Sequence, residues 1–135
     1  MSLPAPDQID ASVCARLSRV CAAQAPIDYR LAEISQFDDG VLYLAADPGA
    51  PFRRLTQAVW RRFPETPPYA GRHADIVPHL SVAWPRDAVS LQQIERDFTA
   101  AAAGHLPITA RATSLALFDN ATGRWERRHS FPFVA

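Results

Sequence analysis

The short apolar segment around His79 has the residue types and the spacing that could do chemistry. It runs Val77-Pro78-His79-Leu80-Ser81-Val82-Ala83, a pattern typical of a short β-strand. Side chains two positions apart in a strand share a face and lie roughly 6.5 Å apart, so His79 and Ser81 could hold one phosphate-sized group between them. Leu80 and Val82 would then point into the core. The pattern also fits a polar strand face turned to solvent.

Hydrophobic spacing along the chain predicts the elements that position this segment. Helical periodicity covers about residues 9–24, continues from Pro51 to Phe63, and follows a Ser90/Gln93 capping-box pattern to about residue 104. Strand patterns cover about residues 27–37, 41–46, 108–118 and 124–133, with glycine-containing turns at 38–40 and 119–123. This order predicts one α+β domain over residues 1–135, with mainly antiparallel sheet backed by helices.

A proline-rich loop over residues 64–75 leads into the His79 strand. Loops of this length in a compact domain are often functional. We therefore expect Tyr69, Arg72 and His73 to lie at the rim of the site that His79 faces.

The composition is that of a globular protein rather than a disordered one. Hydrophobic residues make up 48% of the chain, and the formal net charge is zero, with arginine as the only basic residue other than histidine. A neutral balance argues against broad binding to long nucleic acid but allows a small phosphorylated ligand. The apolar runs are short and interrupted by charges, so we expect no membrane span, no signal peptide and a cytoplasmic location.

The two cysteines do not predict a disulfide or a metal site. Cys14 and Cys21 lie on the first predicted helix, roughly 10 Å apart along its axis, which is beyond disulfide reach. We expect both to be small core residues. The chain has no Cys-x-x-Cys or histidine-rich spacing of the kind that binds zinc, so we predict no metal and no cofactor.

Four segments resemble, in order, parts of the two-histidine phosphoesterases, also called the 2'-5' RNA ligase-like superfamily. The His79 segment resembles the second His-x-Thr/Ser-x motif of that family, and residues 37–44 resemble its central hairpin. Residues 67–73 resemble the loop that enters the motif strand, and residues 123–133 resemble the closing strand. The resemblance implies a bilobal fold, in which each lobe is a sheet backed by helices and the active cleft lies between the lobes.

The resemblance also implies a chemistry. In the family, two imidazoles flank a cyclic phosphate or a 2'-5' phosphodiester, one as general base and one as general acid, with no metal required. Histidine suits both roles because each of its protonation states is accessible near neutral pH. His79 would take one role, and Ser81 would donate a hydrogen bond to a nonbridging phosphate oxygen. Arg72 and His73 would contact the substrate, while Tyr69 or Trp84 would either stack on a base or serve in packing.

The chain departs from the family pattern because it shows only the second motif. Its other histidines are His73, His105 and His129, and none has the full pattern in the expected place. We therefore expect that the chain begins one strand too late and lacks an N-terminal strand carrying the first motif. A missing general acid or base costs about 10²–10⁴ in rate. We expect weak or absent activity unless His73, His129, a second subunit or an upstream strand supplies the partner.

The partner expected from this reasoning is a small phosphorylated nucleotide or an RNA end. Two alternatives from other classes stay open. One is a noncatalytic phosphate- or nucleotide-binding module with a degenerate site. The other is a homodimer in which an exposed sheet edge pairs with a second copy.

Overall fold

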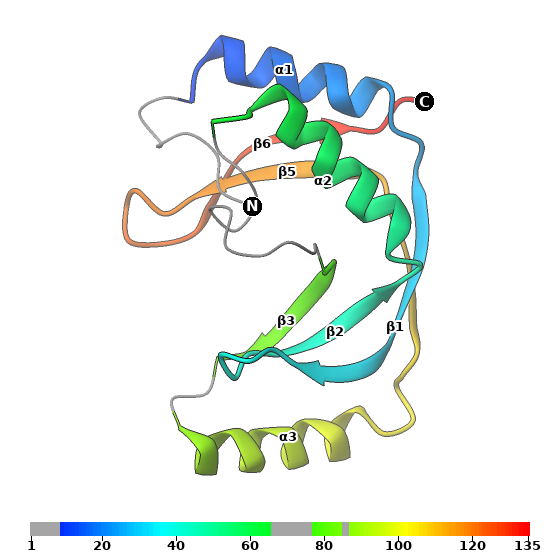
Figure 1. The fold of residues 1–135 in the computed structure, drawn as a ribbon, viewed down its shortest axis with the longest axis vertical. Helices are drawn as coiled ribbons and strands as arrows, with labels where there is room; N and C mark the ends of the chain where they lie inside the picture. The colour runs from blue at the N-terminus through cyan, green and yellow to red at the C-terminus, as the bar shows by residue number, and fades with distance from the viewer. Residues whose placement is uncertain (1–8, 66–76, 85–86) are drawn as a thin grey trace. The chain divides into compact units, whose positions relative to one another are not determined.

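The computed structural model describes residues 9–65, 77–84 and 87–135, and its elements follow the predicted order as far as the third helix (Figure 1). The helices are α1 (Ala11–Ala22), α2 (Ala50–Arg62) and α3 (Ala88–Ala102). The strands are β1 (Ile27–Gln36), β2 (Leu42–Asp47), β3 (His79–Ala83), β4 (Ile108–Ala112), β5 (Ser114–Asp119) and β6 (Glu126–Pro132). The strand pairs β1–β2, β2–β3 and β5–β6 are antiparallel, which confirms the predicted α+β class.

The chain divides into two compact units, each with its own sheet. The first unit holds α1, α2 and the β5–β6 hairpin. The second holds α3 and a four-stranded sheet with the order β3-β2-β1-β4. The His79 segment therefore belongs to the sheet of the second unit, at one end of the strand order.

The core of the first unit is formed mainly by the apolar side chains that recur at helical spacing in α1 and α2. Asp10 caps the start of α1, where its carboxylate accepts a hydrogen bond from the Val13 amide at 3.0 Å. Apolar side chains of α1 and α2 then meet Leu117 of β5 and Phe131 of β6 in one buried cluster. Its other members are Val13, Leu17, Val20, Cys21, Leu55, Val59 and Phe63. Both cysteines are free thiols, as predicted, and Cys21 is buried whereas Cys14 is only half-buried.

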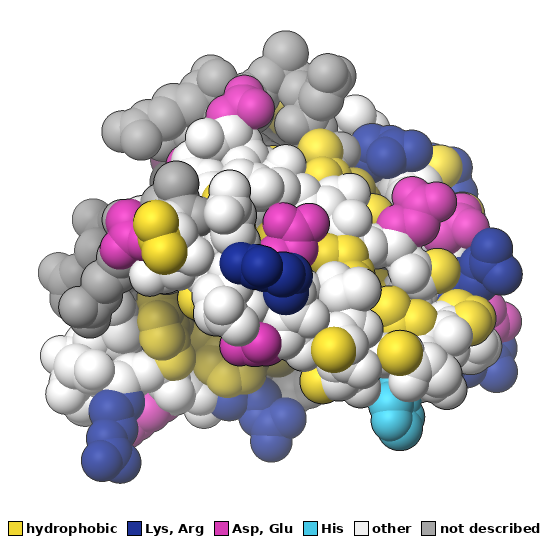
Figure 2. All heavy atoms as spheres, turned by 90° about the horizontal axis from the view of Figure 1, so that it is seen from below, with side chains coloured by type: hydrophobic (Ala, Val, Ile, Leu, Met, Phe, Trp, Pro, Cys, Tyr) yellow, Lys and Arg dark blue, Asp and Glu magenta, His cyan; other side chains and the backbone are white. Residues whose placement is uncertain are grey.

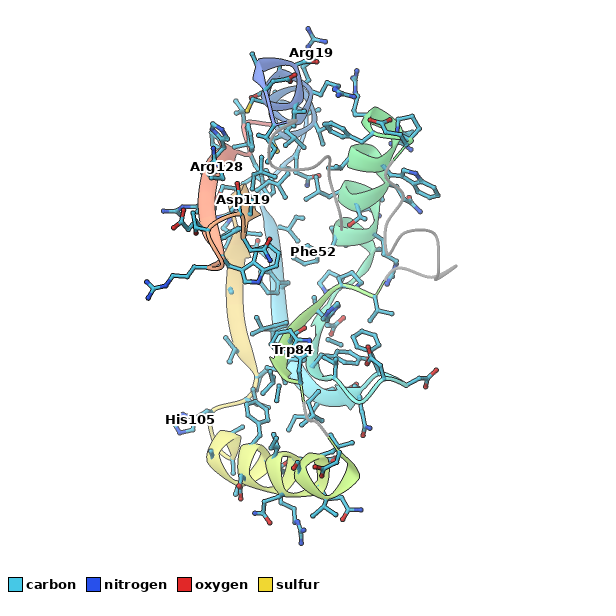
Figure 3. All side chains as sticks on the ribbon, turned by 90° about the vertical axis from the view of Figure 1, so that its left-hand side faces the viewer. Arg19, Phe52, Trp84, His105, Asp119 and Arg128 are labelled. Carbon is cyan, nitrogen blue, oxygen red and sulfur yellow. The ribbon has the colours of Figure 1, made fainter. Side chains whose placement is uncertain are left out.

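The β5–β6 hairpin is held at its turn by Asp119, whose carboxylate is buried. It accepts a hydrogen bond from the Ala121 amide at 3.2 Å and forms an ion pair with Arg128 across the hairpin. Figure 3 shows Asp119 and Arg128 side by side on these two strands. Because the ion pair joins both strands, it stabilises the hairpin that closes the core of the first unit.

The sheet of the second unit begins with the predicted β1–β2 hairpin. Gly40 has a φ of 94°, a left-handed conformation that favours glycine. The Phe37 amide donates to the Val41 carbonyl at 2.9 Å, and the Asp39 carboxylate accepts from the Val41 amide at 3.2 Å. These bonds hold Phe37 close to the start of β2, and the turn predicted at residues 38–40 is confirmed.

The strand predicted over residues 108–118 is wrong, because the structure divides it at Thr113 between β4 and β5, which belong to different sheets. In β4 the less exposed side chains are at even positions, Ala110 and Ala112, whereas in β5 they are at odd positions, including Leu117. One extra residue between two strands with alternating burial shifts the inward-facing side chains from even-numbered to odd-numbered positions. No glycine or proline marks the division in the sequence, so the pattern predicts one strand.

The predicted cap of the third helix is also wrong. The helix begins at Ala88, and its N-cap is Asp87, whose carboxylate accepts a hydrogen bond from the Ser90 amide at 2.7 Å. Ser90 thus lies inside the helix as the donor partner and not as the cap. Serine and aspartate are both favoured N-cap residues, and here the aspartate three positions earlier binds the free amide of the first turn.

The surface mixes charges of both signs. On the face drawn in Figure 2, arginine side chains are interspersed with aspartate and glutamate. Within the described ranges, α1, α2 and α3 are all too short or too polar to cross a membrane.

Candidate functional site

The register between β2 and β3 decides which side chains accompany His79. In this antiparallel pair Ala45 lies opposite His79, and Tyr43 lies opposite Ser81. Directly opposed residues share a sheet face, as do residues two apart in one strand. His79, Ser81, Tyr43 and Ala45 therefore share one face of the sheet, and all four are half-buried.

The imidazole of His79 is held by the chain just before its own strand. Its Nδ1 atom lies 2.6 Å from the carbonyl oxygen of Val77. A carbonyl oxygen only accepts hydrogen bonds, so Nδ1 must carry the proton. The other nitrogen, Nε2, then has a free lone pair in the neutral ring and a proton to give in the charged ring. Nε2 is thus the atom that can exchange a proton with a bound group.

Two aromatic rings surround this imidazole. The rings of Phe37 and Tyr43 stack with centroids 4.0 Å apart and planes 20° apart. The His79 ring meets Phe37 at 4.9 Å and 78°, and Tyr43 at 5.5 Å and 67°, both edge-to-face arrangements. The imidazole therefore lies against an aromatic pair and not in open solvent.

Three hydroxyl-bearing residues form a row across the same face. Tyr43 of β2 pairs with Ser35 of β1 on one side and with Ser81 of β3 on the other. All three side chains are half-buried. Hydroxyl groups can donate to phosphate oxygens or accept from a ligand, so this face combines a proton-exchanging imidazole with several neutral donors.

On the other face of the sheet, Leu80 is not buried as the sequence analysis predicts. Leu80 was expected in the core, but its side chain is 52% exposed, whereas its cross-strand partner Leu44 is 2% exposed. The reason is position, because β2 has strands on both sides whereas β3 ends the strand order. Val82, the other residue expected inside, is half-buried.

Of the remaining predicted site residues, Trp84 is described and three others are not. Trp84 directly follows β3 and is 70% exposed (Figure 3), an arrangement open to stacking on a ligand. Tyr69, Arg72 and His73 lie outside the described residues, so their placement at the rim stays a prediction.

The other described histidines lie away from the His79 strand in the chain and are exposed. His105 follows α3 and points outward (Figure 3). His129 lies in β6 of the first unit, opposite Leu117. Within residues 9–65, 77–84 and 87–135, His, Cys, Asp and Glu side chains form no group of three able to hold a metal ion.

His79 and Ser81 are predicted from the sequence as site residues, whereas Ser35, Phe37 and Tyr43, which lie beside them in the structure, are not. Tyr43 alternates with the buried Leu42 and Leu44, which assigns it to the less buried face of β2. That signal was present in the sequence. Its neighbours on β1 and β3 depend on the register, which local patterns do not give.

Comparison with known proteins gives one family match. The model of the family described as the 2'-5' RNA ligase superfamily matches residues 2–124. Among curated proteins, none matches the chain.

Proposed function

Because the chain belongs to the 2'-5' RNA ligase superfamily, within the two-histidine phosphoesterases, we propose that its His79 face binds and cleaves a phosphodiester. The proposed substrates are a 2',3'-cyclic phosphate or a 2'-5' linkage in a nucleotide or at an RNA end. The reaction is proposed to need no metal and no cofactor, and the protein is proposed to act in the cytoplasm.

One observation carries the proposal, namely the hydrogen bond between His79 Nδ1 and the Val77 carbonyl. With Nδ1 committed to this bond, the imidazole offers a single nitrogen, Nε2, for proton exchange. A general acid or base needs such a defined atom within reach of the substrate proton. Ser81 supports the same role, because it lies two residues later on the same face.

The reaction follows from the two protonation states of Nε2. When unprotonated, Nε2 takes a proton from the water that attacks phosphorus. When protonated, it donates the proton to the leaving ribose oxygen as the phosphorus–oxygen bond breaks. Ser81 would donate its hydroxyl proton to a nonbridging oxygen, where negative charge accumulates in the transition state. Trp84, Tyr69, Arg72 and His73 are proposed to contact the base or the phosphate.

The expected activity of this 135-residue chain is weak. It shows one His-x-Ser motif, and loss of one acid–base partner costs about 10²–10⁴ in rate. A second histidine, supplied by His73, by His129 or by another polypeptide segment, would restore the missing half of the proton transfer.

The test is to incubate the protein with 2',3'-cyclic AMP, and separately with a 2'-5'-linked dinucleotide, in buffer containing EDTA. Turnover should persist in EDTA and fall about 10²–10⁴-fold in His79→Ala. Ser81→Ala should lose about 10- to 100-fold, as expected for one hydrogen bond to a charged group. The matched control is His105→Ala, which removes an exposed histidine outside the site and should keep wild-type turnover.

Two results would contradict the enzyme. Turnover equal in wild type and His79→Ala would come from a contaminant or from another site. Saturable nucleotide binding that needs His79 but gives no product would favour the noncatalytic binding module instead.

A further inference from the structure

We propose that Phe37 and Tyr43 are positioning residues that hold the His79 imidazole in one orientation and one tautomer. This inference rests on the proposed function of His79 as the proton-exchanging group. It assigns a task to an aromatic pair on β1–β2 that neither the motif nor the family match singles out.

The need for such a device follows from the histidine side chain itself. The last torsion of histidine joins a tetrahedral carbon to a flat ring, and its preferred range is broad and roughly two-fold. Backbone position alone therefore leaves the ring plane undetermined. The Val77 hydrogen bond ties down one atom, Nδ1, but the ring can still tilt about that contact.

The two aromatic contacts remove this remaining freedom. Phe37 and Tyr43 each meet the imidazole edge-to-face, at 4.9 Å and 5.5 Å between centroids. Such contacts depend on the angle between planes, so two of them with one hydrogen bond define the plane of the ring. A half-turn of the imidazole would exchange Nδ1 for a carbon at the Val77 carbonyl and break the hydrogen bond.

The aromatic pair is itself well supported by the hairpin. Tyr43 lies in β2, where it pairs with Ser81 two residues from His79. Phe37 is tied to the hairpin turn by the hydrogen bond that its amide donates to the Val41 carbonyl at 2.9 Å. The stack of the two rings, 4.0 Å apart, joins both supports. The hairpin thus sets the position of the imidazole on the neighbouring strand.

This arrangement has a chemical consequence. Because Nδ1–H is fixed toward Val77, Nε2 keeps one direction through both protonation states. The reaction is faster when the reacting group is held in the productive orientation, and a displacement of about 1 Å can lower the rate on the order of 10²-fold. The aromatic pair should therefore affect kcat more than KM.

The experiment measures the His79 tautomer by long-range proton–nitrogen NMR on uniformly ¹⁵N-labelled protein, with His79→Gln to assign the signals. The wild type should show a single tautomer with the proton on Nδ1. Phe37→Leu and Tyr43→Leu should give a mixture of tautomers and, with 2',3'-cyclic AMP, lower kcat about 10- to 100-fold, with KM changed less than about threefold. Tyr43→Phe keeps the ring and should keep the single Nδ1–H tautomer. Trp125→Leu, which removes an exposed indole in the other unit, is the matched control.

The outcomes separate this inference from the proposed function. Tautomer mixing in the leucine variants without turnover by the wild type supports the positioning role and overturns the enzyme. An unchanged Nδ1–H tautomer in both leucine variants overturns the positioning role, whatever the turnover. Mixed tautomers in the wild type would overturn the inference whether or not the leucine variants fold.

Discussion

Replacing Phe63 by alanine removes a fully buried side chain from the core of the first unit. Phe63 is 0% exposed, and the guanidinium of Arg16 lies 4.1 Å from the centre of its ring. Truncating a buried phenylalanine costs about 3–5 kcal/mol, through lost transfer free energy and the cavity left behind. The free energy of unfolding of a whole domain is about 5–15 kcal/mol. We therefore expect Phe63→Ala to lose at least about a fifth of the free energy of unfolding.

Urea unfolding followed by far-UV circular dichroism measures this loss. With a slope of about 2 kcal/mol per molar urea, the midpoint should fall by about 2 M. The matched control is Phe118→Ala, since the Phe118 side chain is 49% exposed on β5 and its removal should cost less than about 1 kcal/mol. Equal midpoints for the two variants, or a shift below about 0.5 M for Phe63→Ala, would refute this account of the core.

Three further predictions concern other parts of the molecule. Burial raises the pKa of the Cys21 thiol, so a thiol reagent at neutral pH should modify the half-buried Cys14 first, and equal rates would count against this burial. Hydrogen bonds from Ser90, chiefly from its backbone amide, lower the pKa of Asp87; the resulting stabilisation of α3 is present above the ordinary carboxylate pKa and is lost as pH falls through the lower, folded-state value. Asp87→Asn should remove this part of the acid dependence of helix content, and an unchanged acid profile would contradict it. If the β3 edge pairs with a second copy, light scattering on concentrated protein should show dimers, whereas monomer alone would argue against the pairing.

The sequence predicted the parts of the fold that depend on local chemistry. The β1–β2 turn was recognisable because Asp-Asp-Gly supplies a carboxylate acceptor and a residue tolerant of positive φ, and Gly40 has a φ of 94°. The first two helices were recognisable because their apolar residues recur at helical spacing and meet in one cluster. In both cases the deciding residues are close together in the chain.

The features that escaped prediction depend on contacts between distant residues. Thr113 divides two strands, yet no glycine or proline marks the division, and the change of parity is visible only once each strand joins its own sheet. Leu80 is exposed because of its strand's place in the sheet, which the apolar pattern of β3 does not reveal. Tyr43 reaches His79 through the β2–β3 register, and Phe37 reaches it by stacking on Tyr43, so both contacts are tertiary.

The two units are interleaved along the gene. In chain order, α1 belongs to the first unit, β1 and β2 to the second, α2 to the first, β3 through β4 to the second, and the final hairpin to the first, so the polypeptide passes between them four times. Neither half can be encoded by one uninterrupted stretch of codons. A ribosome must synthesise the chain through the end of β6 before the β5–β6 hairpin can complete the first unit. Because each unit is built from separate segments of the chain, recombination would have to replace several gene segments at once to exchange one unit. The two units are therefore expected to be inherited together.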